Sequence, residues 1–228
     1  MRRVKIAPSI LAADHADLKG EIHKVEGAGA DMIHVDVADG HFAPNISMGP
    51  DTVKAIRKVT RLPLDVHLMI TDPVTFTKPF LAAGSDIVTA HAEALPENQI
   101  AILSEVVREG GRKFGIALKP ATPIPHWFKQ HLQEIDLLLV LAVNPGFPGQ
   151  AFMPDTLSKV RKAVELADSV DLEVEVDGGV DQENAATIVK AGATVLVAGA
   201  SIFRRGDVKS ALQAMRLVAD RTLQEVSA

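Results

Sequence analysis

The chain has 228 residues, 47% of them hydrophobic, which is enough to bury a sizeable core within one domain. It carries 24 Lys and Arg against 29 Asp and Glu, a mildly acidic balance without a basic stripe, which disfavours a nucleic-acid partner. The sequence contains no cysteine, so disulfides, thiolate metal ligands and a thiol nucleophile are excluded.

No apolar run reaches the length that spans a membrane, so no membrane partner is expected. The basic start, Met1–Lys5, is followed by Pro8, Ser9 and Asp14, which interrupt the apolar stretch that a signal peptide needs. We therefore expect a soluble, cytoplasmic protein.

Apolar, β-branched runs alternate with amphipathic segments along the whole chain. The expected strands are Val4–Pro8, Met32–Val37, Leu64–Leu68, Asp86–His91, Lys113–Leu118, Leu137–Val143, Leu172–Asp177 and Thr194–Ala198. The expected helices include Ala16–Glu26, Met48–Lys58, Asn98–Arg108, Pro154–Ala167 and Gln182–Lys190. Nearly continuous apolar strands separated by helices are typical of a parallel sheet buried on both faces, so the pattern indicates an α/β fold.

A weak internal repeat supports eight such strand–helix units. The triplets Ala28–Ala30, Ala83–Ser85 and Ala191–Ala193 each have a central glycine, which suits the left-handed residue that ends a helix. Their spacings are close to two and four steps of about 27 residues, and eight steps would use nearly the whole chain. We predict a single (β/α)8 TIM-barrel catalytic domain over residues 1–228. An open doubly wound sheet is the rival, but no GxGxxG follows the first strand.

Polar side chains gather at the carboxyl ends of the predicted strands, where such barrels place their active sites. Three strands end in pairs of residues two apart, and such pairs point to the same side of a strand. The pairs are His34 and Asp36, Asp65 and His67, and Glu175 and Asp177. One pair alone is equally well explained as a buried hydrogen-bonded network, but three at one mouth favour a metal site.

Two histidines and two carboxylates from these pairs form a suitable ligand set for one divalent ion, Zn, Mn, Fe or Co. The expected ligands are His34, Asp36, His67 and Asp177. Asp65 and Glu175 are then expected to support the ligands from behind.

Glycines mark a second site after the seventh and eighth strands. Barrels of this kind often bind phosphate through backbone N–H groups of these two loops. Gly178 and Gly179 follow one strand, and Gly199 and Ala200 follow the other. The alternative is that the glycines only permit tight turns. The segment Asn144–Gln150 is either a further turn or a lid beside the phosphate.

A metal between two carboxylates, close to a phosphate site, suggests enolisation of a phosphorylated ketose. A divalent ion can polarise a ketone oxygen and stabilise an enediolate. Removing a proton from one face of the adjacent carbon and returning one to the other face inverts that carbon. Asp36 and Asp177, from strands two and seven, are the candidate acid–base pair.

Six segments, which follow one another in the same order as in the family and span nearly the whole chain, resemble ribulose-phosphate 3-epimerases. They are PSILAAD (Pro8–Asp14), HVDVADGHFAPNISMGP (His34–Pro50), DVHLM (Asp65–Met69), VNPGFPGQ (Val143–Gln150), EVDGGV (Glu175–Val180) and VAGASIF (Val197–Phe203). The resemblance implies a TIM barrel of the ribulose-phosphate-binding type that interconverts D-ribulose 5-phosphate and D-xylulose 5-phosphate in the pentose phosphate pathway. It also implies a homo-oligomer, since the family includes dimers and hexamers.

The resemblance further implies roles for individual residues. His34, Asp36, His67 and Asp177 match the family's metal ligands, with Asp36 as proton acceptor and Asp177 as donor in one direction. The implied substrate contacts are Ser9, His67, Met69, Gly146, Phe147, Pro148, Gly149, Gly178, Gly179, Gly199 and Ala200.

Several positions depart from the family pattern. Ala38 and Leu141 stand where methionines are usual, and Met69 alone remains of the sulfur side chains that cover the reaction zone. Pro148 replaces a lid glycine, Ala142 a common serine or threonine, and Ala200 a common serine. The smaller residue at 38 is expected to enlarge the pocket, and Pro148 to stiffen the lid. A 3-epimerase of another ketose phosphate, such as D-allulose 6-phosphate, is therefore one alternative. A non-catalytic phosphosugar-binding barrel is another.

Overall fold

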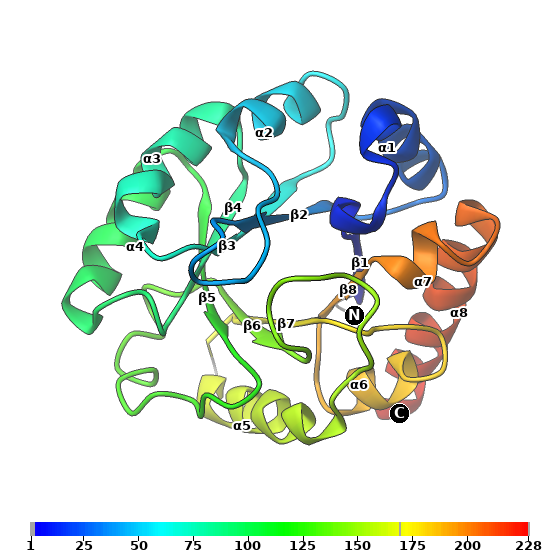
Figure 1. The fold of residues 1–228 in the computed structure, drawn as a ribbon. Helices are drawn as coiled ribbons and strands as arrows, with labels where there is room; N and C mark the ends of the chain where they lie inside the picture. Colours follow the sequence, from blue (N-terminus) through cyan, green and yellow to red (C-terminus); the bar gives the residue numbers. More distant parts are fainter. Residues whose placement is uncertain (1–2, 169, 228) are drawn as a thin grey trace.

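Eight parallel strands form the centre of the structure, and helices surround them (Figure 1). The computed structural model describes residues 3–168 and 170–227. The strands are β1 (Lys5–Pro8), β2 (Ile33–Ala38), β3 (Leu64–Met69), β4 (Ile87–His91), β5 (Lys113–Leu118), β6 (Leu137–Leu141), β7 (Glu173–Asp177) and β8 (Val195–Ala198). All eight predicted strands are confirmed, with small shifts at their ends.

The sheet curls into a nearly closed barrel. Its strand order is β1-β8-β7-β6-β5-β4-β3-β2, so β1 and β2 are the two edges that must meet. Lys5–Pro8 of β1 pairs fully with β8, whereas contact with β2 is made by a single parallel bridge between Ser9 and His34. The predicted (β/α)8 TIM barrel is thus confirmed, and its seam lies beside His34.

The helices form the outer layer of the barrel (Figure 1). They are α1 (Leu18–Gly27), α2 (Pro50–Arg57), α3 (Pro73–Ala83), α4 (Ile100–Glu109), α5 (Leu157–Ala167), α6 (Ala185–Lys190), α7 (Ala200–Phe203) and α8 (Val208–Ser227). The five helices predicted from the sequence are present, and α3, α7 and α8 are additional to them. Within residues 3–168 and 170–227, no helix combines the length and the apolar character needed to cross a membrane.

Each of the five predicted helices begins two or three residues later than its apolar pattern indicates. Short 3₁₀ turns precede α1, α4 and α5, at His15–Asp17, Glu97–Gln99 and Pro154–Thr156. Asp17 caps α1 by accepting the backbone N–H of Gly20, and Pro50 occupies the first position of α2. Capping and proline preferences therefore decide these starts, because the apolar pattern continues into the preceding turn.

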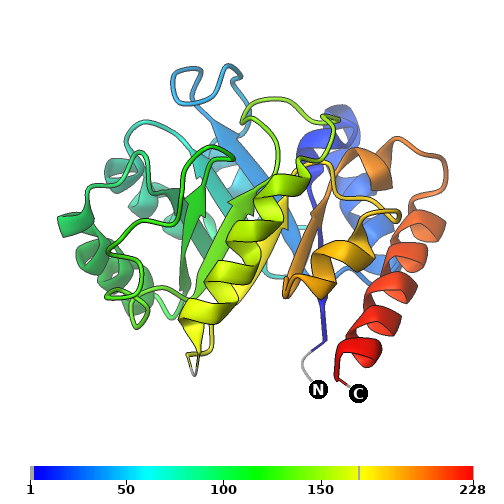
Figure 2. The ribbon, with the colours of Figure 1, turned by 90° about the horizontal axis from the view of Figure 1, so that it is seen from below.

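Apolar side chains pack in two layers, one inside the barrel and one between the strands and the helices. The inner layer includes Met32, Ile87, Leu137 and Val195, which lie at or next to the amino ends of their strands. This end of the barrel is therefore closed by apolar side chains and by the buried Glu173, whose carboxylate pairs with Lys5 at 2.6 Å and with Lys113 at 2.9 Å. Figure 2 shows both termini at this end, opposite the loops that follow the strands. The polar pairs at the carboxyl ends consequently face the other, open end.

The connection between β5 and β6 departs from the expected strand–helix pattern. Within the described part of the chain, no α-helix lies between Leu118 and Leu137. Pro120, Pro123 and Pro125 explain this, because each lacks an N–H and restricts the residue before it. Trp127 and Phe128 are buried in the outer core, in the place where a helix face would otherwise pack.

Lys159 of α5 holds this connection in place. The residue is only 9% exposed, and its Nζ donates to the backbone oxygens of Lys119, Pro120 and Thr122 at no more than 2.9 Å. An ammonium group with three donors satisfies three carbonyls that have no strand or helix partner. The segment after β5 is thereby fixed close to the mouth of the barrel.

Replacing Lys159 by Met should lower the free energy of unfolding by about 2–3 kcal/mol, because charge-assisted hydrogen bonds to three carbonyls are lost. Urea unfolding measures this change. The matched control is Lys162→Met on the same helix, where the ammonium is half exposed and pairs with the exposed Glu165 at 2.8 Å. Equal stability of the two variants would contradict this account of the loop.

Candidate metal centre and active site

The strand register brings the predicted ligands together. His34 and Asp36 lie two residues apart on β2, so both point into the barrel. In the parallel ladder with β3, Asp36 is the partner of His67 and His34 is the partner of Asp65. From β7, Glu175 and Asp177 point inward in the same way. The polar residues therefore form an inner row of His34, Asp65 and Glu175 and an outer row nearer the mouth.

The four predicted metal ligands converge on one point. Asp36 Oδ1 lies 3.3 Å from His34 Nε2 and 3.1 Å from His67 Nδ1. Asp177 Oδ2 lies 4.0 Å and 3.8 Å from the same two nitrogens. One donor atom from each residue lies within 4.8 Å of all the others.

This spacing fits a divalent ion. Nitrogen and carboxylate donors lie about 2.0–2.2 Å from zinc, so donors around one such ion are roughly 3–4 Å apart. The 3.8 Å and 4.0 Å separations are too long for hydrogen bonds from Asp177 to the histidines. Hydrogen bonding alone therefore does not account for the arrangement. Two nitrogens and two carboxylate oxygens suit Zn, Mn, Fe or Co.

The inner row orients His34. Its Nδ1 lies 2.6 Å from Asp65 Oδ2 and 3.2 Å from Glu175 Oε1. Asp65 accepts the Nδ1–H, which directs Nε2 towards the four-donor group, as expected for a carboxylate behind a metal-binding histidine. Both oxygens of the fully buried Glu175 lack a hydrogen-bond partner. Burial and the neighbouring Asp65 raise the pKa of Glu175 well above its usual range, so this side chain holds a proton more readily than an exposed carboxyl group does.

The pKa values of the two candidate acids are shifted in opposite directions. Burial alone would raise the pKa of Asp36, but His34 and His67 outweigh it and hold this pKa below the usual range. Ser9 Oγ also donates to Asp36 Oδ2 at 2.6 Å. For Asp177, burial and the charge of Asp36 raise the pKa to about 6. One acid is therefore ionised and its partner holds a proton more readily, the difference that acid–base catalysis needs.

The histidines also differ in charge. Burial opposes the charged form of His34, yet Asp36 and Asp65 raise its pKa well above the usual value. His91, on β4 behind His67, is fully buried, and this burial lowers its pKa to about 4. Burial opposes ionisation of Glu93 too, but hydrogen bonds that include one from His91 lower its pKa to about 2.

A cavity of about 420 Å³ opens from Asp36 and Asp177 towards solvent. All but one of the residues predicted to contact substrate line it. They are Ser9, Met69, Gly146, Phe147, Pro148, Gly149, Gly178, Gly179, Gly199 and Ala200. His67 does not line it, because its ring is fully buried with one nitrogen facing Asp36 and the other facing His91.

The glycines after β7 are required by the backbone. Gly178 and Gly179 have φ values of +107° and +67°, which L side chains rarely adopt. A Cβ on Gly179 would lie 2.4 Å from the backbone nitrogen of Phe152. The loop after β6 and the loop after β7 therefore pass close to each other at the cavity wall. The lack of a side chain at Gly179 makes this close approach possible.

Two loops meet over the mouth. Asn45, after β2, donates its side-chain amide to the carbonyl oxygen of Gly146, after β6, at 2.7 Å. Gln150 Nε2 donates to the carbonyl oxygens of Asn144 and Phe147, which shapes the second loop. The segment predicted to be a lid is thus linked to the opposite rim, and Phe147 on it is 57% exposed.

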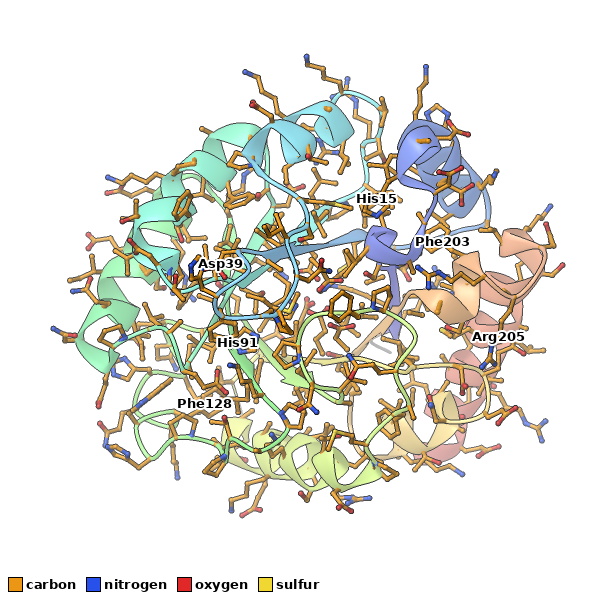
Figure 3. All side chains as sticks on the ribbon, in the orientation of Figure 1. His15, Asp39, His91, Phe128, Phe203 and Arg205 are labelled. Carbon is orange, nitrogen blue, oxygen red and sulfur yellow. The ribbon has the colours of Figure 1, made fainter. Side chains whose placement is uncertain are left out.

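Two charged residues at the cavity were not predicted from the sequence. Arg205, after α7, is the one basic residue of its described lining, and its Nη1 lies 3.7 Å from Asp181, which also lines it. Figure 3 shows Arg205 beside the orange segment that follows β8. No sequence pattern marks either residue, because both lie on loops whose paths depend on the packing of α6 and α7.

Comparison with known proteins agrees with this geometry. A sequence profile described as the ribulose-phosphate 3 epimerase family matches residues 5–203. The chain belongs to this family. It is 46% identical to ribulose-phosphate 3-epimerase of Bacillus subtilis, over 93% of this chain and 98% of the relative. It is 40% identical to that of Escherichia coli, over 95% of this chain and 96% of the relative.

Solved structures with low sequence identity share the barrel. 3-Hexulose-6-phosphate synthase from Salmonella typhimurium matches with a TM-score of 0.71 and 16% identity, covering 97% of this chain and 99% of its own. Thiamine phosphate pyrophosphorylase from Pyrococcus furiosus matches with a TM-score of 0.63 and 20% identity, covering 97% and 98%. These likenesses concern the fold alone.

The departures from the epimerase family pattern differ in their position. Leu141 lines the cavity, together with Met69. Ala38 is outside the described lining, packed with Ala43, Met69 and Phe42. Ala38 therefore reaches the cavity only through Met69, which belongs both to this cluster and to the cavity lining.

In metal-free protein, Asp177→Asn should raise the free energy of unfolding at pH 8 by about 2–3 kcal/mol. The pKa of Asp177 is raised to about 6 from its ordinary value of 3.8, so its stabilising effect is fully present below pH 3.8 and is lost as the pH rises through 6. The uncharged amide of the variant does not lose stability in this way. The difference in free energy of unfolding between variant and wild type should therefore shrink below pH 6.

Urea unfolding after chelation, at pH 8 and then in steps below pH 6, measures the effect. Adding a divalent ion at pH 8 should make the wild type the more stable of the two proteins, because only the wild type keeps all four ligands. A difference that does not vary with pH would contradict the assigned pKa direction.

Proposed function

We propose that this protein is a metal-dependent ribulose-phosphate 3-epimerase, which reversibly inverts C3 of D-ribulose 5-phosphate to give D-xylulose 5-phosphate. The main observation in support is the pair Asp36 and Asp177, which share one four-donor group and line one cavity but have pKa values shifted in opposite directions. The names and coverage of the relatives agree with this activity.

The ionised Asp36 is suited to take the proton from C3, and this leaves an enediolate. The protonated Asp177 then delivers a proton to the opposite face of C3, so the carbon is inverted. After one turnover Asp36 holds a proton and Asp177 is ionised, which is the starting state for the reverse reaction. The hydroxyl of Ser9 holds Asp36 through Oδ2, which fixes the position of the accepting carboxylate.

One divalent ion, Zn, Mn, Fe or Co, would be held by His34, Asp36, His67 and Asp177. When bound, it supplies Lewis-acid stabilisation of the negative charge on the ketose oxygen. The inner residues Asp65 and Glu175 would keep His34 oriented towards it.

The phosphate would bind at the far wall of the cavity, against the loops after β7 and β8. Gly178, Gly179, Gly199 and Ala200 line this wall without large side chains. Ser201 does not replace the serine that the family has at position 200, because its hydroxyl donates to the backbone oxygen of Val180 at 2.6 Å. Arg205 is the nearest source of positive charge for an anionic group there.

A second candidate substrate is another ketose phosphate, such as D-allulose 6-phosphate. Leu141 in the cavity wall favours this reading, since the family usually has methionine there. A non-catalytic phosphosugar-binding barrel would not need two acids of unlike protonation in one cavity. The family resemblance also supports a cytoplasmic homo-oligomer.

Incubation with D-ribulose 5-phosphate in deuterated water should place deuterium at C3 of the xylulose 5-phosphate formed, because the returned proton is not the one removed. NMR of the products measures this. Comparison of kcat/KM over pentulose and hexulose phosphates should rank ribulose 5-phosphate first. Turnover without label at C3 would exclude the two-acid mechanism. A higher kcat/KM for allulose 6-phosphate would make that sugar phosphate the preferred substrate.

A further inference from the structure

His91 is a buried histidine that the proposed mechanism leaves unused. It is the last residue of β4, adjacent to β3, which carries His67. Its exposure is 0%, and Figure 3 shows it within the ring of helices. A buried imidazole at the edge of a metal site needs partners for both ring nitrogens. The contacts of its two nitrogens are therefore informative.

The first nitrogen faces His67. His91 Nε2 lies 2.9 Å from His67 Nε2, and the two ring centroids are 5.0 Å apart. A nitrogen contact this short between rings this far apart means that the rings meet through their nitrogen edges. Two ring nitrogens at hydrogen-bonding distance share one hydrogen, so one donates and the other accepts.

The contact of the second nitrogen, Nδ1, decides which of the two rings donates the shared hydrogen. His91 Nδ1 lies 2.9 Å from Glu93 Oε2. An ionised carboxylate only accepts, so the hydrogen of a neutral His91 is on Nδ1. The Nε2 atom of His91 must then accept, and the hydrogen between the rings belongs to His67 Nε2. His67 Nδ1 lies 3.1 Å from Asp36, and with a divalent ion held between the two it would need no hydrogen to donate to that carboxylate, so Nδ1 is the atom that can bind the metal.

Neighbouring groups hold both members of this pair. The second oxygen of Glu93, Oε1, accepts the backbone N–H of Lys119 at 2.8 Å. Phe42 lies against His91 with ring centroids 4.6 Å apart, and the Lys119 ammonium lies 3.6 Å from the centre of the Phe42 ring. Glu93 is thus fixed at both oxygens, and His91 is held between His67 and Phe42.

We propose that His91 and Glu93 are positioning residues that keep a hydrogen on Nε2 of His67 and so present its Nδ1 lone pair to the divalent ion. The inference rests on the proposed function, because it concerns the ion that the epimerase would use. It adds a second orienting carboxylate to the site, acting on His67 through an intervening imidazole as Asp65 acts directly on His34.

NMR of metal-free protein labelled with ¹⁵N in histidine tests the hydrogen position directly and needs neither metal nor substrate. At pH 8, His67 should show a hydrogen on Nε2, coupled across the hydrogen bond to an unprotonated Nε2 of His91. An unprotonated His67 Nε2 would overturn the proposal. The outcome is independent of whether the protein turns over ribulose 5-phosphate.

Titration with Co²⁺, followed by its visible absorption, tests the consequence for the metal. His91→Phe removes the acceptor while keeping an aromatic side chain, and Co²⁺ affinity should fall by about 10–100-fold. His91→Gln supplies an amide oxygen as acceptor and should restore most of the affinity. Glu93→Leu should weaken binding and Glu93→Gln should largely retain it.

The matched control is Glu97→Gln, a 44% exposed carboxylate that contacts His126 and His131 only at 3.8 Å or more. It should leave Co²⁺ affinity unchanged. Wild-type affinity in a folded His91→Phe variant would overturn the proposal, as would equal loss in His91→Phe and His91→Gln. If the wild type binds no divalent ion, the metal part of the proposed function fails, and the NMR result alone then decides the hydrogen position.

Discussion

Mutual repulsion of the carboxyl groups inside one end of the barrel is the constraint on which the site depends. Asp36, Asp65, Glu175 and Asp177 converge there, and each lies within 4.0 Å of an imidazole nitrogen of His34 or His67. Each carboxylate taken out of water costs several kcal/mol unless it is paired. This cost is offset to different extents at the individual carboxyl groups. His34 and His67 lower the pKa of Asp36, while burial raises the pKa values of Glu175 and Asp177.

This inequality links the fold to the chemistry. The apolar side chains and the Glu173 ion pairs at the amino ends of the strands close this end of the barrel, so the acids depend on one another and on the histidines. The two positive charges of a divalent ion would take the place of the protons that the buried acids and histidines hold without it. Acids on β2 and β7 then approach a sugar carbon from different sides of the barrel. A reversible inversion needs this asymmetry, because each acid must finish in the state in which the other began.

The sequence predicted the strands and the residues at their carboxyl ends well, since the period of two in a strand determines which side chains point inward. His34, Asp36, His67 and Asp177 follow from that rule and from parallel pairing. The starts of the helices were less predictable, because caps and prolines override the apolar pattern. Arg205, Asp181 and the partners of His91 were not predictable, since loop paths bring them to the site. The missing helix after β5 follows from three prolines whose effect a repeat of about 27 residues conceals.

The central claim is that Asp36 and Asp177 act on opposite faces of one sugar carbon. Loss of deuterium from C3-labelled ribulose 5-phosphate and xylulose 5-phosphate, measured for Asp36→Asn and Asp177→Asn with metal content determined in parallel, tests it most directly. The account predicts that neither variant epimerises, and that each exchanges C3 of one epimer only, with the two variants selecting opposite epimers. Exchange of the same epimer by both metal-loaded variants, or epimerisation near the wild-type rate in either, would contradict it.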